Sequence, residues 1–366
     1  MGSYDVLRRA GVKLIWFDSM GAKSSSILVK TSDGYVIIDP GAAAMQPSYP
    51  LSAEEKAELR GKAIDRIERY LIKCKAVIIT HYHYDHHVLP EDPQLRRYVN
   101  PYGGKLLILK DPNQYINASQ WGRARAFIAS LAEHSGTTLD ELLTPPAKND
   151  FPDPLEGLEE AASVDWGSYS SRKAELLRRG RKWFEKLAKE YWGSKDWVRE
   201  AELPDGTKLV WGDGRTFDFG NTRFKVLGPW FHGLEYDRTG WVTPVVIEKP
   251  GAKVFYSSDV MGPEIEDYAR AIVEEMPDAI ILDGPPTYLF PYMLNRINLR
   301  RAVSNVVRII RECEPDLIVY DHHLLRECRW RERVREVFET ARKFGVRVVT
   351  AAEYMRRKPL IDSVCG

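Results

Sequence analysis

Short apolar runs bounded by turn residues recur along the first 110 residues, and each run predicts a β-strand. Between the third and fourth runs, residues 52–74 carry apolar side chains at helical spacing. Ser52 followed by Glu55 matches a capping box, which favours a helix that begins at this point. The predicted strands of this half cover residues 13–17, 26–30, 34–41, 76–80 and 105–110.

The strand pattern returns after residue 205 and alternates with helical spacing toward the end of the sequence. Two halves, each a run of strands with helices to cover them, predict an α/β protein. We expect a four-layer αββα sandwich, with helices outside two facing sheets. The predicted strands of this half cover residues 208–212, 222–230, 242–249, 253–259, 278–284, 316–321 and 346–350, and the predicted helices cover 264–276, 295–312 and 330–344.

Residues 112–205 differ in character from the segments on either side. They hold helical stretches, no strong strand and a proline-rich spacer at residues 144–154. Because the strand pattern resumes afterwards, we expect a helical insertion within a single domain that covers residues 1–366. Within the insertion, residues 172–192 predict a basic helix that also carries aromatic side chains.

Charge and hydropathy exclude several classes of protein. Lys and Arg number 53 against 52 for Asp and Glu, so the formal net charge is +1. This balance argues against a protein whose whole surface binds nucleic acid or anionic lipid. No apolar run is long enough to span a membrane, and the first residues lack the apolar core of a signal peptide. We therefore expect a cytoplasmic protein that does not enter a membrane.

The cysteine and amide contents add two further expectations. The cysteines are scattered and form no CxxC pair, which argues against both a disulfide scaffold and a thiolate zinc site. Only 4 Gln and 8 Asn occur among 366 residues, while charged residues are abundant, a composition typical of a heat-adapted protein. The cysteines are Cys74, Cys313, Cys328 and Cys365.

Histidines are few, and six of the eight lie in two short clusters at residues 81–87 and 322–323. His81 and His83 alternate directly after a predicted strand, so both rings point the same way. Asp85 follows where the chain must turn, and we expect it to face a second point nearby. Imidazole and carboxylate donors suit Zn²⁺, Mn²⁺ or Fe²⁺ and do not suit Ca²⁺.

Other candidate ligands also follow predicted strands. Asp259 ends the strand at 253–259, although by itself it also fits the N-cap of the helix at 264–276. His322 and His323 follow the strand at 316–321, and alone they would be ordinary residues at a sheet edge. Together, separate strand ends that each deliver His or Asp predict a two-metal centre at one sheet edge.

The HxHxDH motif at residues 81–86 resembles the metallo-β-lactamase superfamily, because Asp39 precedes it and His232, Asp259 and His322 follow in order. The resemblance covers residues 13–110 and 206–350 and implies an αββα fold. Four further segments, together with HYHYDHH, resemble a largely archaeal family of predicted metallo-hydrolases. These segments are INASQWGR (116–123), SSDVMGP (257–263), GPPTYL (284–289) and DHHLLRE (321–327).

The resemblance implies a ligand set for two divalent metal ions, with zinc as the first expectation and manganese or iron as alternatives. It implies that Asp39 orients the histidine loop, and we expect His87 to support the same loop or to be structural. His323 stays open as an alternative to His322. The implied ligands are His81, His83 and His232 for one metal, Asp85, His86 and His322 for the other, and Asp259 bridging the two.

A centre of this kind implies hydrolysis, with a metal-bound hydroxide as the nucleophile. Asp85 is a ligand that can also accept a proton during attack. His323 and Tyr288 are candidates to donate a proton to the leaving group or to stabilise developing negative charge. Tyr288 is also consistent with an ordinary core tyrosine.

The first substrate hypothesis is a phosphodiester or nucleic acid. Cationic and aromatic groups of residues 172–192 suit such a substrate, although a solvated amphipathic helix looks the same. Arg123 and Arg125 are candidates to bind an anionic group. Two alternatives stay open: hydrolysis of an ester, thioester or lactone, and a non-catalytic metal-binding protein. A second copy of the chain stays open as a partner.

Overall fold

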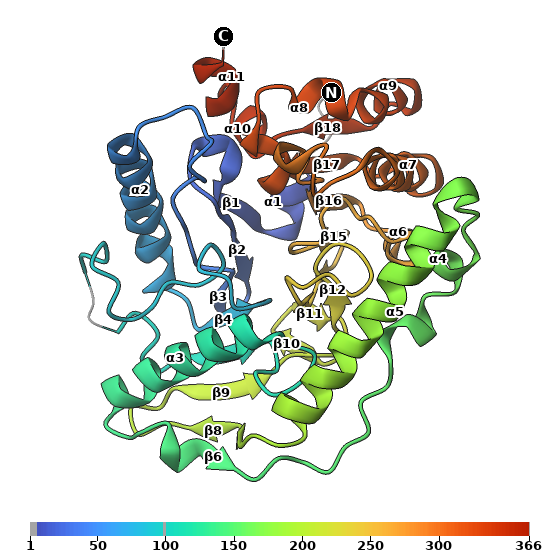
Figure 1. Ribbon diagram of the computed structural model, residues 1–366. Helices are drawn as coiled ribbons and strands as arrows, with labels where there is room; N and C mark the ends of the chain where they lie inside the picture. The colour runs from blue at the N-terminus through green and yellow to red at the C-terminus, as the bar shows by residue number, and fades with distance from the viewer. Residues whose placement is uncertain (1–5, 98–99, 366) are drawn as a thin grey trace.

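The computed structural model describes residues 6–97 and 100–365 and contains two seven-stranded sheets with helices around them (Figure 1). In the first sheet the order is β1-β2-β3-β4-β5-β9-β8. Its pairs from β3 to β9 are parallel, and the remaining pairs are antiparallel. The strands are β1 (Val12–Phe17), β2 (Ser25–Thr31), β3 (Gly34–Ile38), β4 (Ala76–Ile79), β5 (Leu106–Leu109), β9 (Lys208–Trp211) and β8 (Ala201–Glu202).

The second sheet has the order β10-β11-β14-β15-β16-β17-β18. Its pairs are antiparallel from β10 to β15 and parallel from β15 to β18. In both sheets, therefore, parallel strands send their carboxyl ends to one common edge. The strands are β10 (Thr216–Phe219), β11 (Thr222–Val226), β14 (Val245–Lys249), β15 (Ala252–Tyr256), β16 (Ala279–Asp283), β17 (Leu317–Asp321) and β18 (Arg347–Val349).

Alternating side chains divide the core into two hydrophobic clusters. On β16, Ile281 joins a cluster that contains residues of both sheets, such as Ile27 of β2. The next residue along, Ile280, points to the other face and joins a cluster with Val306 and Val337 from covering helices. The α/β fold with a four-layer αββα sandwich is thus confirmed. The main helices of these outer layers are α2 (Ala53–Leu71), α6 (Glu266–Glu275), α7 (Arg296–Cys313) and α9 (Arg335–Phe344).

Some elements differ from the sequence-based predictions. The helix predicted over 330–344 is divided at Val334 into α8 (Trp330–Arg333) and α9. The insertion contributes β8 to the edge of the first sheet, because its backbone pairs with β9. Short elements complete the described chain: α1 (Val6–Ala10), β6 (Leu143–Thr144), α4 (Glu159–Ser163), β7 (Trp197–Val198), β12 (Trp230–Phe231), β13 (Trp241–Val242), α10 (Ala351–Tyr354) and α11 (Leu360–Val364).

The insertion packs its aromatic side chains inward. Its long helices are α3 (Ala118–Ser135) and α5 (Ser170–Leu187), and α5 runs along one side of the molecule (Figure 1). Trp183 stacks on Trp241 with ring centres 5.6 Å apart, and Trp192 is fully buried. Trp192 therefore fills the core beneath the insertion, and Trp183 packs against that core while it stays partly exposed.

A buried ion-pair cluster fastens α5 to the second half of the protein. Lys173 of α5 lies 2.5 Å from Glu235, and Arg301 of α7 lies 2.9 Å from the other oxygen of the same carboxylate. Arg301 also contacts Glu266 at 2.5 Å. Glu235 thus joins the insertion to α7 through charges that are almost fully removed from water.

The cysteines correct one expectation. Cys328 and Cys365 form a disulfide with Cα atoms 5.7 Å apart, which ties α11 to the segment before α8. The spacing of 37 residues gave no sign of this pair, because only the fold brings the two segments together. Cys74 and Cys313 are buried thiols.

No helix within residues 6–97 and 100–365 combines the length and apolar character that a bilayer crossing requires.

Glu235→Gln should destabilise the protein, because it leaves Lys173 and Arg301 buried without their shared carboxylate. We expect the free energy of unfolding to fall by about 3 kcal/mol, measured by urea denaturation. As a control, Glu175→Gln removes an exposed pair with Arg172 on the same helix and should leave the urea midpoint nearly unchanged. Equal effects of the two variants would contradict this role for Glu235.

The same carboxylate should make the free energy of unfolding depend on pH. Burial would raise the pKa of Glu235, but the charges of Arg301 and Lys173 outweigh burial and lower the pKa to about 2. Because the folded pKa is depressed, this stabilisation is complete above the ordinary pKa and is lost as the pH falls toward 2. The urea midpoints of the native protein and Glu235→Gln should therefore differ at neutral pH and approach each other as the pH falls toward 2.

Candidate metal centre

The predicted site residues meet where strands of both sheets end. Asp39 follows β3, His81 follows β4 after one residue, and Asp259 comes three residues after β15. His322 directly follows β17 and begins the 3₁₀-helix η7 (His322–Arg326). The backbones of Asp39 and His322 have φ of 49° and 59°, a conformation that costs energy in residues other than glycine. Strain of this kind is often retained where side chains must be aimed at a functional site.

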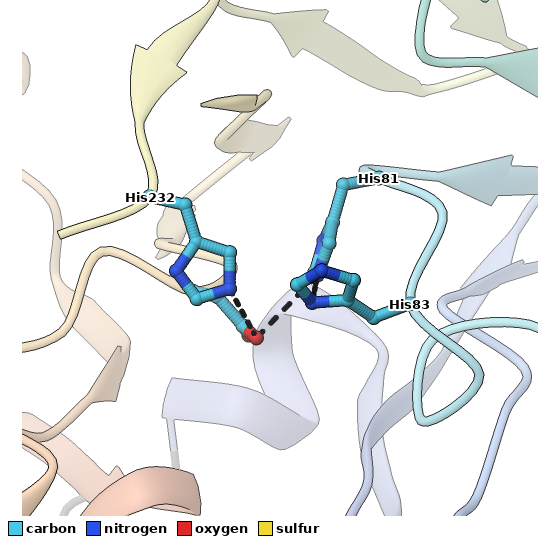
Figure 2. Close-up of side chains that lie close together, drawn as sticks. His81, His83 and His232 are labelled. Carbon is cyan, nitrogen blue, oxygen red and sulfur yellow. Dashed lines mark hydrogen bonds and ion pairs between the residues drawn. The ribbon is translucent and has the colours of Figure 1, made fainter. Parts of the chain in front are cut away.

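Asp259 lies at the centre, and its Oδ2 atom faces the first predicted ligand set. This oxygen lies 3.5 Å from Nε2 of His81 and 3.3 Å from Nε2 of His232. Nδ1 of His83 lies 3.1 Å from the same nitrogen of His81. The three imidazole rings converge on one point from two separate segments (Figure 2). Donor atoms of His81, His83, His232 and Asp259 lie within 4.8 Å of one another.

The Oδ1 atom of Asp259 faces the second predicted set. It lies 3.0 Å from Nε2 of His86 and 3.2 Å from Nε2 of His322. Oδ2 of Asp85 lies 3.8 Å from Nε2 of His322. Donor atoms of Asp85, His86, His322 and Asp259 again lie within 4.8 Å of one another. One carboxylate therefore separates two groups of ligands, with one oxygen turned toward each.

Several of these atoms are buried without a hydrogen-bond partner. They include Nε2 of His86, both ring nitrogens of His232 and both carboxylate oxygens of Asp259. Burying polar atoms unpaired costs free energy, and a cation between them removes that cost. Imidazole and carboxylate donors suit zinc and similar divalent ions. The residues present therefore fit two divalent metal ions.

Asp39 fixes the orientation of the His86 ring. Its Oδ2 atom lies 2.8 Å from Nδ1 of His86 and accepts a hydrogen bond of 2.7 Å from the Tyr256 hydroxyl. Its other oxygen accepts the backbone N–H of Thr80 at 2.8 Å. These bonds fix the ring so that Nε2 faces Asp259, which is the orienting role expected for Asp39.

Asp18 holds His322 in the same way, and sequence reasoning missed it. Oδ1 of Asp18 lies 2.7 Å from Nδ1 of His322, while its Oδ2 accepts a bond of 2.6 Å from Nε of Arg326. The only signal in the sequence is that Asp18 directly follows a strand. His87 supports the loop through its Nδ1 atom, 3.0 Å from the carbonyl oxygen of His83.

His323 belongs to a different arrangement from His322. Its Nδ1 atom lies 3.0 Å from both oxygens of Asp283, and its backbone N–H donates to the same carboxylate at 3.1 Å. The structure thus places His322 beside Asp85, and turns His323 toward Asp283. Asp283 was also missed, although it too ends a strand, β16.

Electrostatic coupling within the centre is strong. Burial lowers the pKa of His81 to about 4, so this ring is neutral as a metal ligand must be. Burial would also lower the pKa of His322, but Asp259 and Asp18 raise it well above the usual range. Burial would raise the pKa of Asp259, yet His322 and His86 hold it well below the ordinary value. Without metal, positive histidines thus balance the buried carboxylate.

The remaining predicted residues lie at different places around the centre. Arg123 lies over the ring of Tyr84, within the histidine motif, at 5.1 Å. Arg125 stacks on Trp121 and donates to backbone carbonyls of Pro112 and Asp196, each at 2.9 Å, so its guanidinium is engaged in holding the insertion. Tyr288 is half-buried, and its ring lies 5.7 Å from the guanidinium of Arg326.

Comparison with known proteins agrees with this geometry. Residues 21–87 match the family model of the metallo-beta-lactamase superfamily, a segment that contains Asp39 and the histidine motif. A solved metallo-beta-lactamase fold protein, YhfI from Bacillus subtilis, is similar over 93% of this chain and 95% of its own. Its identity is 12% and its TM-score is 0.43. The likeness to the metallo-beta-lactamase superfamily therefore rests on the segment that holds Asp39 and the histidine motif.

Curated relatives give the narrower family. A UPF0282 protein from Korarchaeum cryptofilum is 30% identical over 344 residues, which are 94% of this chain and 88% of that protein. A UPF0282 protein from Methanopyrus kandleri is 28% identical over 348 residues, covering 93% and 92%. The chain belongs to the UPF0282 family, and its resemblance to archaeal proteins is confirmed.

Single substitutions should separate the two ligand sets. We expect about two zinc ions per chain in the native protein and about one in His322→Ala, measured by elemental analysis after dialysis. His323→Ala is the matched control and should keep both ions, since its ring is held by Asp283. Loss of an ion in the control alone would assign the last ligand position to His323.

Proposed function

We propose that the protein is a metal-dependent hydrolase with a dinuclear centre. The observation that carries this proposal is Asp259, whose two oxygens each face a complete set of donors. When bound, two divalent ions activate water and polarise the bond under attack. His83 is only partly buried, which supports access of solvent to the first ligand set. This exposure supports a catalytic centre and argues against a purely structural one.

The chain's own residues supply the proton transfers. Asp85 belongs to the second ligand set and can also accept a proton when water attacks. His323 is the proposed proton donor to the leaving group: Asp283 fixes the ring from the Nδ1 side, so the proton transferred is the one that the imidazolium carries on Nε2. Tyr288 adds a hydroxyl group near Arg326, in a position to bind developing negative charge.

A phosphodiester is the proposed substrate. Arg326 is a buried cation 3.5 Å from Asp85, which supports a substrate whose charge is negative. For the alternative, an ester, thioester or lactone, we would expect an apolar pocket built from aromatic residues of the insertion. Trp192 is buried and Trp183 stacks on Trp241, so these rings pack within the core or against it. The insertion's basic helix is not needed for the phosphodiester proposal.

Bis(p-nitrophenyl) phosphate tests the reaction class. The protein loaded with zinc or manganese should release p-nitrophenol, followed by absorbance. The double variant Asp85→Ala, His86→Ala removes two donors of the second set and should abolish turnover. If the native protein holds two metals and does not turn over this substrate, the phosphodiesterase proposal fails.

Asp283→Asn tests the orientation of His323. We expect kcat for the same substrate to fall about 100-fold with KM nearly unchanged, because ring orientation affects proton donation more than substrate binding. Metal content should stay at the native level. A rise in KM with an unchanged kcat would show that Asp283 does not act through proton transfer.

A further inference from the structure

Arg326 occupies a fixed position beside the second ligand set. Its Nε atom bonds to Asp18, and its Nη2 atom lies 3.5 Å from Oδ2 of Asp85 and 3.4 Å from Nε2 of His322. The side chain is almost fully buried. A guanidinium held on one edge in this way keeps further N–H groups for a ligand that approaches the same side of the centre.

The backbone of Lys23 lies on the same side of the centre as Arg326. Its N–H and carbonyl both pair with Ala43, each at 2.9 Å. Gly41 lies close against the histidine loop, since a Cβ atom there would come 2.2 Å from the backbone nitrogen of His87. On the other side, the N–H of Ser24 donates to Asp18 at 2.8 Å. Lys23 therefore sits between the loop that carries the ligands and the carboxylate that holds Arg326.

The ammonium group of Lys23 has no partner among the described residues. The side chain is half-buried, and no hydrogen bond or ion pair joins it to residues 6–97 or 100–365. Burial and the charge of Arg326 lower the pKa of Lys23, while Asp85 and Asp18 oppose this shift. The ammonium group thus lies within the electrostatic field of all three side chains.

The carboxylates nearest to this side of the centre are already engaged. Asp18 is already shared by His322 and Arg326, and Asp85 is a predicted metal ligand. Arg326 keeps Asp18 as its counter-charge, whereas the half-buried Lys23 has no ion pair among the described residues, so an anion from outside would supply the missing partner of Lys23. A tetrahedral oxyanion accepts several charge-assisted hydrogen bonds at once, which suits one guanidinium and one ammonium group.

We propose that Lys23 and Arg326 form a binding site for a phosphoryl group of the substrate, on the side of the second ligand set. This inference deepens the proposed function and rests on it, since it names the part of the phosphodiester that the protein recognises. Neither residue has been assigned to metal binding. Because Arg326 lies 3.5 Å from Asp85, a phosphoryl group held by its guanidinium would lie next to the second ligand set.

Inorganic phosphate is the probe that tests this site. Calorimetric titration of the zinc-loaded protein at low ionic strength should detect phosphate binding, and Lys23→Gln should weaken it about tenfold or more. Lys23→Arg should restore most of the affinity. Lys30→Gln removes an exposed lysine further along the same segment and should leave the affinity unchanged. Zinc content and melting temperature of each variant show whether the centre and the fold are intact.

The outcomes separate this inference from the reaction class. Phosphate binding that depends on Lys23 supports the site even if bis(p-nitrophenyl) phosphate is not hydrolysed, in which case the phosphodiesterase proposal alone fails. Equal phosphate affinity in the native protein and Lys23→Gln overturns the site, whatever the activity. Acetate binding that depends on Lys23, with no such dependence for phosphate, overturns the phosphoryl assignment.

Discussion

The carboxylate of Asp259 is the point on which the arrangement of the centre depends. It is fully buried, and each of its oxygens lies within about 3.5 Å of imidazole nitrogens from a different ligand set. A buried negative charge of this kind is stable only when cations or protonated groups surround it. The chain therefore has to bring four separate segments, each with donor atoms, to one small volume. Two sheets whose parallel strands end at a common edge meet this requirement.

Carboxylates at three strand ends each hold a histidine ring by its Nδ1 side. Asp39 and Asp18 hold His86 and His322 so that Nε2 of each ring faces Asp259. Asp283 holds the Nδ1 side of His323. Each carboxylate is itself held by backbone N–H groups or neighbouring side chains. Ring orientation is thus set by the sheets and not by the metal. A site preformed in this way loses less freedom when ions or substrate bind.

The sequence pointed to the residues that converge around Asp259 but not to the carboxylates that hold their rings, for a physical reason. Alternation of side chains after a strand fixes the direction of His81 and His83, and so dense a run of imidazole and carboxylate donors is typical of a metal site. A lone Asp18 or Asp283 after a strand has many ordinary roles, and its partner is decided by how the sheets pack. The layers of the fold were predicted from periodicity, because apolar alternation directly reports two buried faces. The Cys328 disulfide was missed because spacing alone carries no information on distant pairing.

The cluster around Glu235 gives the insertion a thermodynamic connection to the metal centre. Glu235 is three residues beyond His232. The loop that presents His232 is therefore the same loop that forms ion pairs with α5 and α7. Any ion that holds His232 in place therefore also favours the docked position of α5. Linkage makes this relation reciprocal: whatever binds to and stabilises the docked insertion increases the affinity for the ion by the same factor. Binding to the insertion can thus change the affinity for the metal without any direct contact with it.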